Sequence, residues 1–206
     1  MAAGTGLRVD HAVTSGTFSL DGETHEVDNN VWVVGDDDEC VVIDAPHSVD
    51  DILAVVGGRT VKAIIATHAH DDHVRVAPEL RRRVGAPILL HPADKPVWEL
   101  THADELWDVD LSDEQSIKIA GASMKVLHTP GHAPGAVCLY VHDLGCVFTG
   151  DTLFHGGPGA TGRSFSDADL IKESIRARLL ELPDDTVVHT GHGEDTTIGQ
   201  ERVNLE

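Results

Sequence analysis

The sequence predicts an α/β fold, a four-layer αββα sandwich in which two packed mixed β-sheets lie between outer helices. Short strand candidates occur in two successions along the chain, and each succession is followed by a helical pattern. Successions of this kind pack as two sheets with helices on their outer faces. Histidine and aspartate residues recur directly after several strand candidates, and ligands of open α/β folds collect at the carboxyl ends of strands. We therefore expect these residues to meet at one edge of the sheets.

The first succession begins with short strands and turns, which indicates an antiparallel start. Asp21-Gly22 is a hairpin signal between the first two strand candidates. Ser48 can cap a helix over residues 49–56 that ends at a glycine pair, and residues 74–84 have helical spacing up to a glycine stop. The strand candidates of this half are residues 17–20, 30–34, 40–43, 61–66 and 87–91.

The second succession is rich in brief strands separated by glycine or proline turns. Residues 92–110, which precede it, are polar and predict a short helix and an irregular loop. Residues 167–181 follow four of the strands and have one apolar face at helical spacing, which predicts an outer helix. The strand candidates of this half are residues 117–119, 124–128, 136–141, 146–148 and 186–188.

The composition is that of an acidic globular protein. The 206 residues include 35 acidic and 15 basic residues, and the net charge of −20 makes nucleic acid and anionic membranes poor partners. We expect a single domain over residues 1–206, with residues 1–16 as a candidate disordered segment; no oligomeric state is predicted. A secretory leader and a run of about 18 apolar residues are both missing from the sequence, which predicts a soluble, cytoplasmic protein. Three cysteines in apolar strand candidates fit a reducing compartment, and they are Cys40, Cys138 and Cys146.

The densest group of metal-ligand side chains is Thr67-His68-Ala69-His70-Asp71-Asp72-His73. The apolar, β-branched run before it predicts a buried strand that ends at this loop. Side chains alternate along an extended chain, so His68 and His70 point to one side and can chelate one ion. Asp72 and His73 follow where the chain turns into a helix, and they point elsewhere. Two groups with two directions predict two metal ions.

Three later loops complete a recognisable pattern: Gly131-His132, Gly150-Asp151 and Gly191-His192-Gly193. Together with the His68–His73 segment, and in this order, they resemble the metallo-β-lactamase superfamily over about residues 31–201. Within that superfamily the chain is similar to glyoxalase II-like hydrolases. The matching stretches are Thr67-His68, Thr129-Pro130-Gly131-His132 and Gly150-Asp151-Thr152-Leu153-Phe154.

Position by position, the resemblance implies two metal sites that share one carboxylate. The ligands of the first site would be His68, His70 and His132. The ligands of the second site would be Asp72, His73 and His192. Asp151 would bridge both ions. Asp44, at the end of a strand candidate, matches the acidic residue that the family places behind the site, and an ordinary turn aspartate is the alternative reading.

The same residues predict hydrolytic chemistry. Three neutral imidazoles are typical of a catalytic zinc site with an open position, and added carboxylates allow iron or manganese. We therefore expect two divalent metal ions, with zinc first and iron or manganese as alternatives. A hydroxide between two cations forms near neutral pH, because bound water is acidified to a pKa of about 7 in the best-known zinc case. It would attack a polarised carbonyl, with Asp72 as the catalytic residue that orients the water or shuttles its proton, or as a ligand only.

A thioester suits such a site, because thiolates leave easily and bind zinc. The expected partner is thus a small-molecule substrate, an acyl or formyl thioester of a low-molecular-weight thiol. Glyoxalase II proper has a further C-terminal helical region that helps to hold glutathione, and this chain ends at Glu206 without it. Mycothiol is therefore an alternative to glutathione. The glycine-rich segment 155–164 could shape the pocket, and its Arg163 could pair with a substrate carboxylate.

Two other functions are compatible with the motifs. The first is an iron-dependent persulfide dioxygenase that uses one ion to activate oxygen. The second is a lactonase or β-lactamase-like hydrolase, although a β-lactamase is expected to carry an export signal. A nuclease of the superfamily would need a basic groove, which this acidic sequence does not predict.

Overall fold

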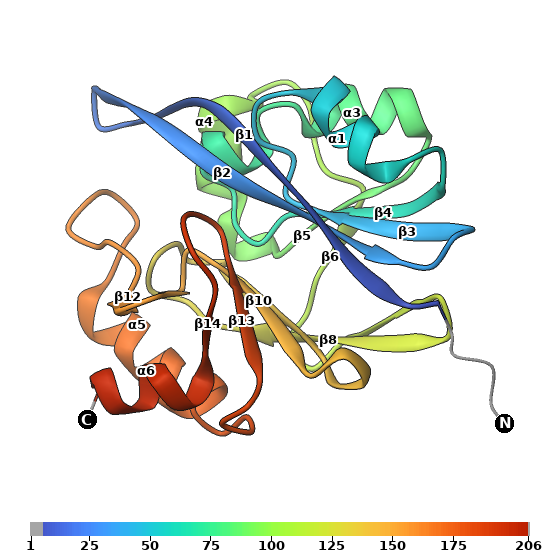
Figure 1. The fold of residues 1–206 in the computed structure, drawn as a ribbon. Helices are drawn as coiled ribbons and strands as arrows, with labels where there is room; N and C mark the ends of the chain where they lie inside the picture. Colours follow the sequence, from blue (N-terminus) through green and yellow to red (C-terminus); the bar gives the residue numbers. More distant parts are fainter. Residues whose placement is uncertain (1–5, 206) are drawn as a thin grey trace, which may run out of the picture.

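Two mixed β-sheets of six strands each lie face to face in the computed structural model, which describes residues 6–205. Helices cover the outer face of each sheet, so the predicted four-layer αββα sandwich is confirmed (Figure 1). The strand order is β1-β2-β3-β4-β5-β6 in the first sheet and β14-β13-β10-β9-β8-β7 in the second. The first sheet contains β1 (Arg8–Leu20), β2 (Glu23–Gly35), β3 (Glu39–Ile43), β4 (Thr60–Ile65), β5 (Ile88–Leu90) and β6 (Val109–Asp110). The second contains β7 (Ser116–Ile119), β8 (Ala122–His128), β9 (Val137–Val141), β10 (Cys146–Gly150), β13 (Val187–Thr190) and β14 (Thr196–Thr197).

Alternating side chains of the first sheet fill two separate cores. On β2, Val31 and Val33 pack against the outer helices, whereas Trp32 and Val34 face the second sheet. The period of two in strand side chains produces this division. The Trp32 ring lies 5.9 Å from that of Phe148 on β10, so aromatic packing joins the two sheets. The strands that carry the predicted ligands are therefore held from both sides.

The helices over the first sheet depart from the prediction at one point. The expected helix over 74–84 is divided, because Val76 leaves the helical region with φ −104° and ψ 9° and Pro78 lacks an N–H group for a continuous helix. The first piece begins at Asp71, inside the histidine-rich segment. The helices of this layer are α1 (Val49–Val56), α2 (Asp71–Val74), α3 (Ala77–Val84), the 3₁₀ turn η1 (Pro92–Asp94) and α4 (Lys95–Thr101).

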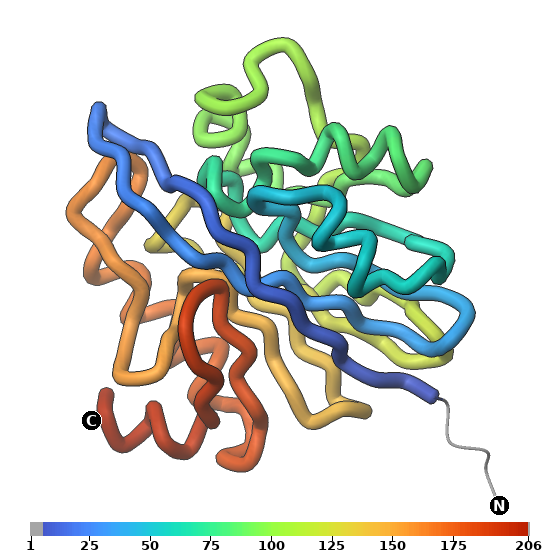
Figure 2. The backbone as a smooth tube through the Cα atoms, turned by 45° about the horizontal axis from the view of Figure 1, so that its top comes forward, coloured from blue at the N-terminus to red at the C-terminus, as the bar shows by residue number. Residues whose placement is uncertain are grey.

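Residues 8–16, which belong to the segment that was a candidate for disorder, form the first part of strand β1. It begins at Arg8 and pairs with β2 from the Arg8–Gly35 pair to the Leu20–Glu23 pair. Most of its side chains are exposed or half-buried, so backbone pairing holds it and no apolar pattern marks it. Residues 1–5 of that candidate segment lie outside the described residues. The tip of the β1–β2 hairpin reaches the loop after β12 (Gly157–Pro158), where Asp21 Oδ2 accepts the Ser164 N–H at 2.9 Å (Figure 2).

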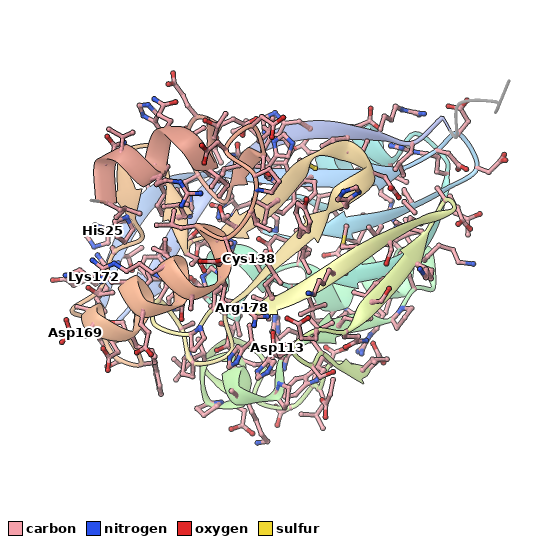
Figure 3. All side chains as sticks on the ribbon, turned by 90° about the horizontal axis from the view of Figure 1, so that it is seen from below. His25, Asp113, Cys138, Asp169, Lys172 and Arg178 are labelled. Carbon is pink, nitrogen blue, oxygen red and sulfur yellow. The ribbon has the colours of Figure 1, made fainter. Side chains whose placement is uncertain are left out.

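The outer layer of the second sheet begins where predicted but is interrupted. Asp167 caps α5 (Ala168–Ser174), and the π-helical turn η3 (Ile175–Leu179) follows directly. Arg178 of η3 pairs with Asp113 at 2.6 Å and so connects this helix to the loop before β7 (Figure 3). The remaining elements are the 3₁₀ turn η2 (His142–Leu144), β11 (Leu153–Phe154), which pairs with β12, and α6 (Ile198–Leu205).

The three cysteines, Cys40, Cys138 and Cys146, are free and buried in the apolar layers, as predicted. Every helix within residues 6–205 is too short or too polar to cross a lipid bilayer.

Candidate metal centre

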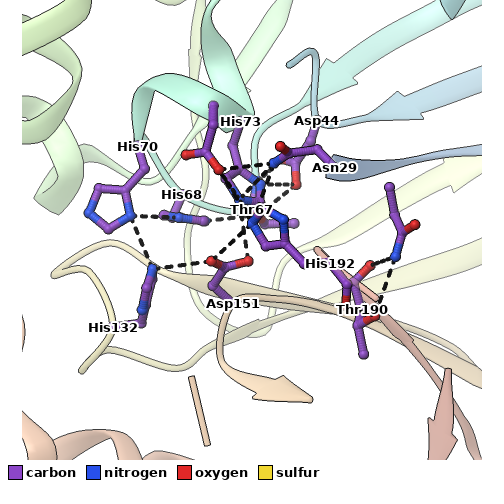
Figure 4. Close-up of polar contacts among 12 residues, drawn as sticks. Asn29, Asp44, Thr67, His68, His70, His73, His132, Asp151, Thr190 and His192 are labelled. Carbon is purple, nitrogen blue, oxygen red and sulfur yellow. Dashed lines mark hydrogen bonds and ion pairs between the residues drawn. The ribbon is translucent and has the colours of Figure 1, made fainter. Parts of the chain in front are cut away.

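Seven histidine and aspartate side chains converge at the carboxyl ends of four strands (Figure 4). The loop after β4 supplies four of them, and the loops after β8, β10 and β13 supply one each. These loops are far apart in sequence, and they meet at one edge of the two sheets. The structure thus brings together all of the residues predicted as ligands, which are His68, His70, Asp72, His73, His132, Asp151 and His192.

The first cluster consists of three buried histidines. His68 Nε2 lies 3.0 Å from His70 Nδ1, and His132 Nε2 lies 3.0 Å from the same atom. His132 Nδ1 donates to the Ala160 carbonyl at 2.8 Å, which leaves the Nε2 lone pair directed at the cluster. Three nitrogens thus face one point.

The second cluster combines Asp72, His73 and His192. Asp72 Oδ2 lies 3.3 Å from His192 Nε2 and 3.7 Å from His73 Nε2, and the two Nε2 atoms are 3.3 Å apart. The other ring nitrogen of each histidine is occupied, because His73 Nδ1 donates to Asp44 and His192 Nδ1 donates to the Asp28 carbonyl. Both rings are therefore oriented with Nε2 toward the cluster.

Asp151 lies between the two clusters. Its Oδ1 is 3.3 Å from His73 Nε2, and its Oδ2 is 3.5 Å from His132 Nε2 and 3.4 Å from His192 Nε2. The buried Oδ1 accepts no hydrogen bond from any described residue. One carboxylate therefore contacts imidazoles of both clusters, which is the arrangement expected of a bridging ligand.

Burial lowers the pKa of each histidine in the first cluster. The pKa of His68 falls well below its ordinary value, that of His70 falls to about 3, and that of His132 is also lowered. Desolvation penalises the charged imidazolium, so these rings are neutral at physiological pH and keep a free lone pair. Neutral imidazoles only 3.0 Å apart are the donor set of a divalent cation.

The second cluster is an ion-pair network. Burial lowers the pKa of His73 and His192, but the charge of Asp151 outweighs it, so the pKa of His73 rises well above normal and that of His192 to about 10. Burial likewise raises the pKa of Asp72 and Asp151, but His73 outweighs it, and the pKa of Asp72 falls to about 2 and that of Asp151 well below normal. A cation that enters this cluster must displace protons from the imidazoles.

The donor atoms of both clusters fit divalent metal ions. Nitrogen donors in the first cluster and mixed nitrogen and carboxylate donors in the second suit zinc, iron and manganese. A cation would also coordinate Asp151 Oδ1, which accepts no hydrogen bond from the described residues.

Asp44 lies behind the second cluster, as predicted by position. Its Oδ1 accepts the Thr67 N–H at 2.7 Å, and its Oδ2 accepts from Thr67 Oγ1 at 2.9 Å and from His73 Nδ1 at 2.8 Å. It adopts φ 63°, a left-handed conformation that turns the chain sharply at the end of β3. Asp44 thus connects the orientation of His73 to the start of the ligand loop.

Sequence reasoning missed Asp94, which joins two ligand loops. This residue is completely buried, and its carboxylate accepts the N–H groups of Ala69 and Gly135. Burial outweighs those hydrogen bonds and raises the pKa of Asp94 to about 6. Asp94 lies in a polar stretch of the sequence, where η1 meets α4, so no periodic signal marked it.

Asn29 and His47 were missed as well. Asn29 comes from β2 and donates to Asp72 Oδ2 at 3.1 Å, and His47 Nε2 contacts Asn29 Oδ1 at 2.8 Å. Asn29 precedes an apolar run and His47 was one of many unassigned histidines, so only the tertiary contacts reveal them.

Arg163 does not enter either cluster. It is exposed, its guanidinium lies 5.0 Å from the centre of the Phe18 ring, and its NH2 is 3.3 Å from His25 Nε2. The Phe18 ring in turn lies 5.2 Å from that of His70. One aromatic ring therefore separates Arg163 from the first cluster.

A cleft of about 460 Å³ opens beside the clusters. Asp151 and His192 form part of its wall, so the shared edge of the two clusters is accessible from it. The complete set of lining residues is Asp151, Phe154, His155, Ala160, His192, Gly193 and Glu194.

The chain is similar to proteins of known family. Residues 26–192 match the sequence model of the metallo-beta-lactamase superfamily. The chain is 38% identical over 154 residues to the hydroxyacylglutathione hydrolase GloC of Haemophilus influenzae, which covers 68% of this chain and 73% of that protein. A solved structure of the B3 metallo-beta-lactamase BLEG-1 matches with a TM-score of 0.78 and 30% identity, over 92% of this chain and 97% of the other. A structure of TTHA1623 in a di-iron-bound form matches with a TM-score of 0.77 and 32% identity, over 92% and 96%.

Proposed function

The chain belongs to the metallo-β-lactamase superfamily, and on that basis we propose that it is a dinuclear metal-dependent hydrolase that cleaves the thioester of a low-molecular-weight thiol. The observation that carries the proposal is the pair of ligand clusters that meet at Asp151 beside an accessible cleft. The first ion would be held by His68, His70 and His132. The second would be held by Asp72, His73 and His192, with Asp151 shared.

Two bound divalent cations would acidify a water molecule and polarise the substrate carbonyl. The role of the protein is to hold the donors in place and to orient the reactants. Asp72 is buried and its pKa is about 2, so it stays ionised and is a poor store for a proton at neutral pH. We therefore assign Asp72 to ligation and to accepting a hydrogen bond from water, in preference to proton shuttling.

The cleft supports a small-molecule substrate. Its volume of about 460 Å³ suits a compact acyl thioester, and Phe154 and Ala160 give it apolar surface beside Asp151. The similarity to a hydroxyacylglutathione hydrolase supports a thioester of glutathione, with mycothiol as the alternative thiol and an acyl or formyl group as the part released. Zinc is the proposed metal, with iron or manganese as alternatives.

Arg163 is proposed to bind a carboxylate of the thiol. Its guanidinium contacts an aromatic ring and a histidine, so its charge is available at the rim of the site. Arg163→Gln should raise KM for an anionic thioester severalfold and leave kcat unchanged, because binding away from the reacting carbonyl is lost equally from ground and transition states. Arg163→Lys, which keeps the charge, is the matched control.

Hydrolysis of a β-lactam is the second candidate function. It is favoured by the 30% identity to a B3 metallo-beta-lactamase over nearly the whole chain. A mononuclear persulfide dioxygenase is less consistent with the site, because it would leave the complete cluster of Asp72, His73 and His192 without a role.

The test is a turnover screen of protein loaded with zinc, iron or manganese, with metal content measured alongside. The substrates are a hydroxyacyl thioester of glutathione, acyl and formyl thioesters of mycothiol and coenzyme A, a β-lactam and a persulfide. We expect release of free thiol from one of the thioesters, and loss of that release in His132→Ala. Protein that binds two ions but cleaves none of the thioesters would refute the proposal, and oxygen uptake on the persulfide with one iron would favour the dioxygenase.

A further inference from the structure

Asn29 stands at the fourth corner of the second cluster. It is completely buried on β2, and its Nδ2 atom lies 3.1 Å from Asp72 Oδ2, 3.4 Å from His73 Nε2 and 3.4 Å from His192 Nε2 (Figure 4). Only the first of these contacts is a normal hydrogen bond in length. The amide nitrogen is therefore nearly as close to the two imidazoles, at 3.4 Å, as they are to one another, at 3.3 Å.

The four atoms form a nearly regular tetrahedron. The three cluster atoms are separated by 3.3, 3.3 and 3.7 Å, and Asn29 Nδ2 completes the figure with edges of 3.1 to 3.4 Å. The centre of a tetrahedron with edges of about 3.4 Å is about 2.1 Å from each corner, and zinc–nitrogen and zinc–oxygen distances are about 2.0–2.2 Å. A cation bound equally by Asp72, His73 and His192, on the side of these three atoms that faces Asn29, would thus also meet its amide, and the shared Asp151 carboxylate would be a further ligand.

His47 holds the other end of this amide. Its Nε2 lies 2.8 Å from Asn29 Oδ1, and its Nδ1 has no hydrogen-bond partner among the described residues. The neighbours of Nδ1 therefore do not fix the tautomer, and Nε2 can either donate to Oδ1 or accept from Nδ2. A half-turn of the amide exchanges Oδ1 and Nδ2 in nearly the same space. Gly16 on β1 leaves room for this histidine, because a Cβ atom at that position would lie 2.3 Å from His47 Nδ1.

We propose that Asn29 is a further protein ligand of the second cation, beside Asp72, His73, His192 and the shared Asp151, with Oδ1 turned toward the ion and Nδ2 donating to His47 Nε2. This inference rests on the proposed dinuclear function. Without the ion, the amide turns its NH2 group to Asp72, as observed. With the ion, a neutral oxygen donor is added to the two imidazoles and the carboxylates of Asp72 and Asp151, and the amide brings no further charge into the buried site. His47 positions the amide in both orientations.

The alternative is that Asn29 only orients Asp72 through a hydrogen bond. Asn29→Ala removes the amide in either case and should weaken binding of the second ion about 10- to 100-fold. Asn29→Asp separates the two roles. A carboxylate can occupy the corner as a ligand, so binding of the second ion should return to the wild-type level or exceed it. If the amide acts only as a donor, Asp is as poor as Ala and also repels Asp72.

The measurement is a stepwise titration of metal-free protein with zinc and with cobalt in competition with a chromophoric chelator. The first ion, at His68, His70 and His132, should bind every variant as it binds the wild type, which also shows that each variant is folded. Cobalt added after one equivalent of zinc reports the second site by its visible absorption, which should change in Asn29→Ala and resemble the wild type in intensity in Asn29→Asp. His47→Phe keeps a ring in place without the hydrogen bond and should weaken only the second step, severalfold.

The outcomes separate this inference from the proposed function. Wild-type protein that binds fewer than two ions would overturn the dinuclear function, and with it the role of Asn29. Wild-type protein that binds two ions, together with an Asn29→Ala variant of unchanged affinity, would overturn the role of Asn29 alone. Equal loss in Asn29→Asp and Asn29→Ala would also overturn direct ligation. An unchanged second step in His47→Phe would overturn its part in holding the amide.

Discussion

Replacing Asp94 by asparagine tests how a buried carboxylate connects two of the ligand loops. Asp94 is completely buried and accepts the N–H groups of Ala69, between two predicted ligands, and of Gly135, near His132. Burial outweighs these two hydrogen bonds and raises the pKa of Asp94 from 3.8 to about 6. Asparagine has nearly the same shape but does not titrate. The pH dependence of the difference between the two proteins therefore isolates this carboxyl group.

The direction of this pH dependence follows from the raised pKa of Asp94. The folded protein binds the Asp94 proton more tightly than the unfolded chain, so the resulting stability is complete below about pH 3.8 and is lost as the pH rises through about 6. A shift of about two units corresponds to about 3 kcal/mol, of which about 2 kcal/mol falls between pH 4.5 and 7. The free energy of unfolding of the wild type, minus that of Asp94→Asn, should fall by about 2 kcal/mol over this interval.

Urea unfolding followed by tryptophan fluorescence, at steps from pH 4.5 to 7, measures this difference. Both proteins are kept metal-free with a chelator, because metal release has its own pH dependence. Asp94→Ala is the matched control without any acceptor, and it should cost about 1–3 kcal/mol for each buried N–H group that it leaves unpaired, with no pH dependence of its own. A difference between the wild type and Asp94→Asn that is constant, or that grows with pH, would refute the reasoning.

Three further predictions concern the clusters themselves. Asp151→Ala should lose or uncouple both ions, because this carboxylate contacts both clusters, and elemental analysis that finds two ions per chain would contradict the assignment. Between pH 6 and 8, affinity for the second ion should rise about tenfold per pH unit for each proton that the ion displaces, since the pKa of His192 is about 10 without metal. Affinity for the first ion should change little, because the pKa of His70 is about 3. Chelator competition measures both affinities, and an equal dependence on pH in the two steps would count against this prediction. Gly191→Ala should weaken metal binding about 10- to 100-fold by calorimetry, because its Cβ would lie 2.4 Å from Asp151 Oδ1, and native affinity would mean that the loop adjusts freely.

The layered fold could be predicted because its central strands carry local signals. The apolar runs at 40–43 and 61–66 match β3 (Glu39–Ile43) and β4 (Thr60–Ile65) closely, since nearly all of β3 and the second half of β4 are buried on both faces. The first part of β1 gave no such signal, because the strand is held by backbone pairing with β2. The division of helix 74–84 at Val76 was also missed, because the helical spacing of the apolar residues continues across it.

The predicted ligands and the residues that hold them differ in how the sequence encodes them. The ligands are dense and ordered, so spacing and a family resemblance were enough to select them. Asn29, His47 and Asp94 act through contacts with loops that are distant in sequence, such as Asn29 to Asp72 and Asp94 to Gly135. One buried amide or carboxylate in a polar segment has no periodic pattern. Only the packed structure shows what such a residue touches.

The charge pattern of the two clusters implies different roles for the two ions in stability. In the second cluster, protons on His73 and His192 already compensate Asp72 and Asp151, so this cluster keeps its attraction without a metal. In the first cluster, burial keeps the imidazoles neutral, and their lone pairs face one another at 3.0 Å with only the Asp151 carboxylate nearby. A cation relieves that contact, whereas in the second cluster it must first replace protons. The first ion should therefore add more to the free energy of unfolding than the second at neutral pH. At equal concentrations of free metal, the difference follows from the logarithm of the ratio of the two affinities.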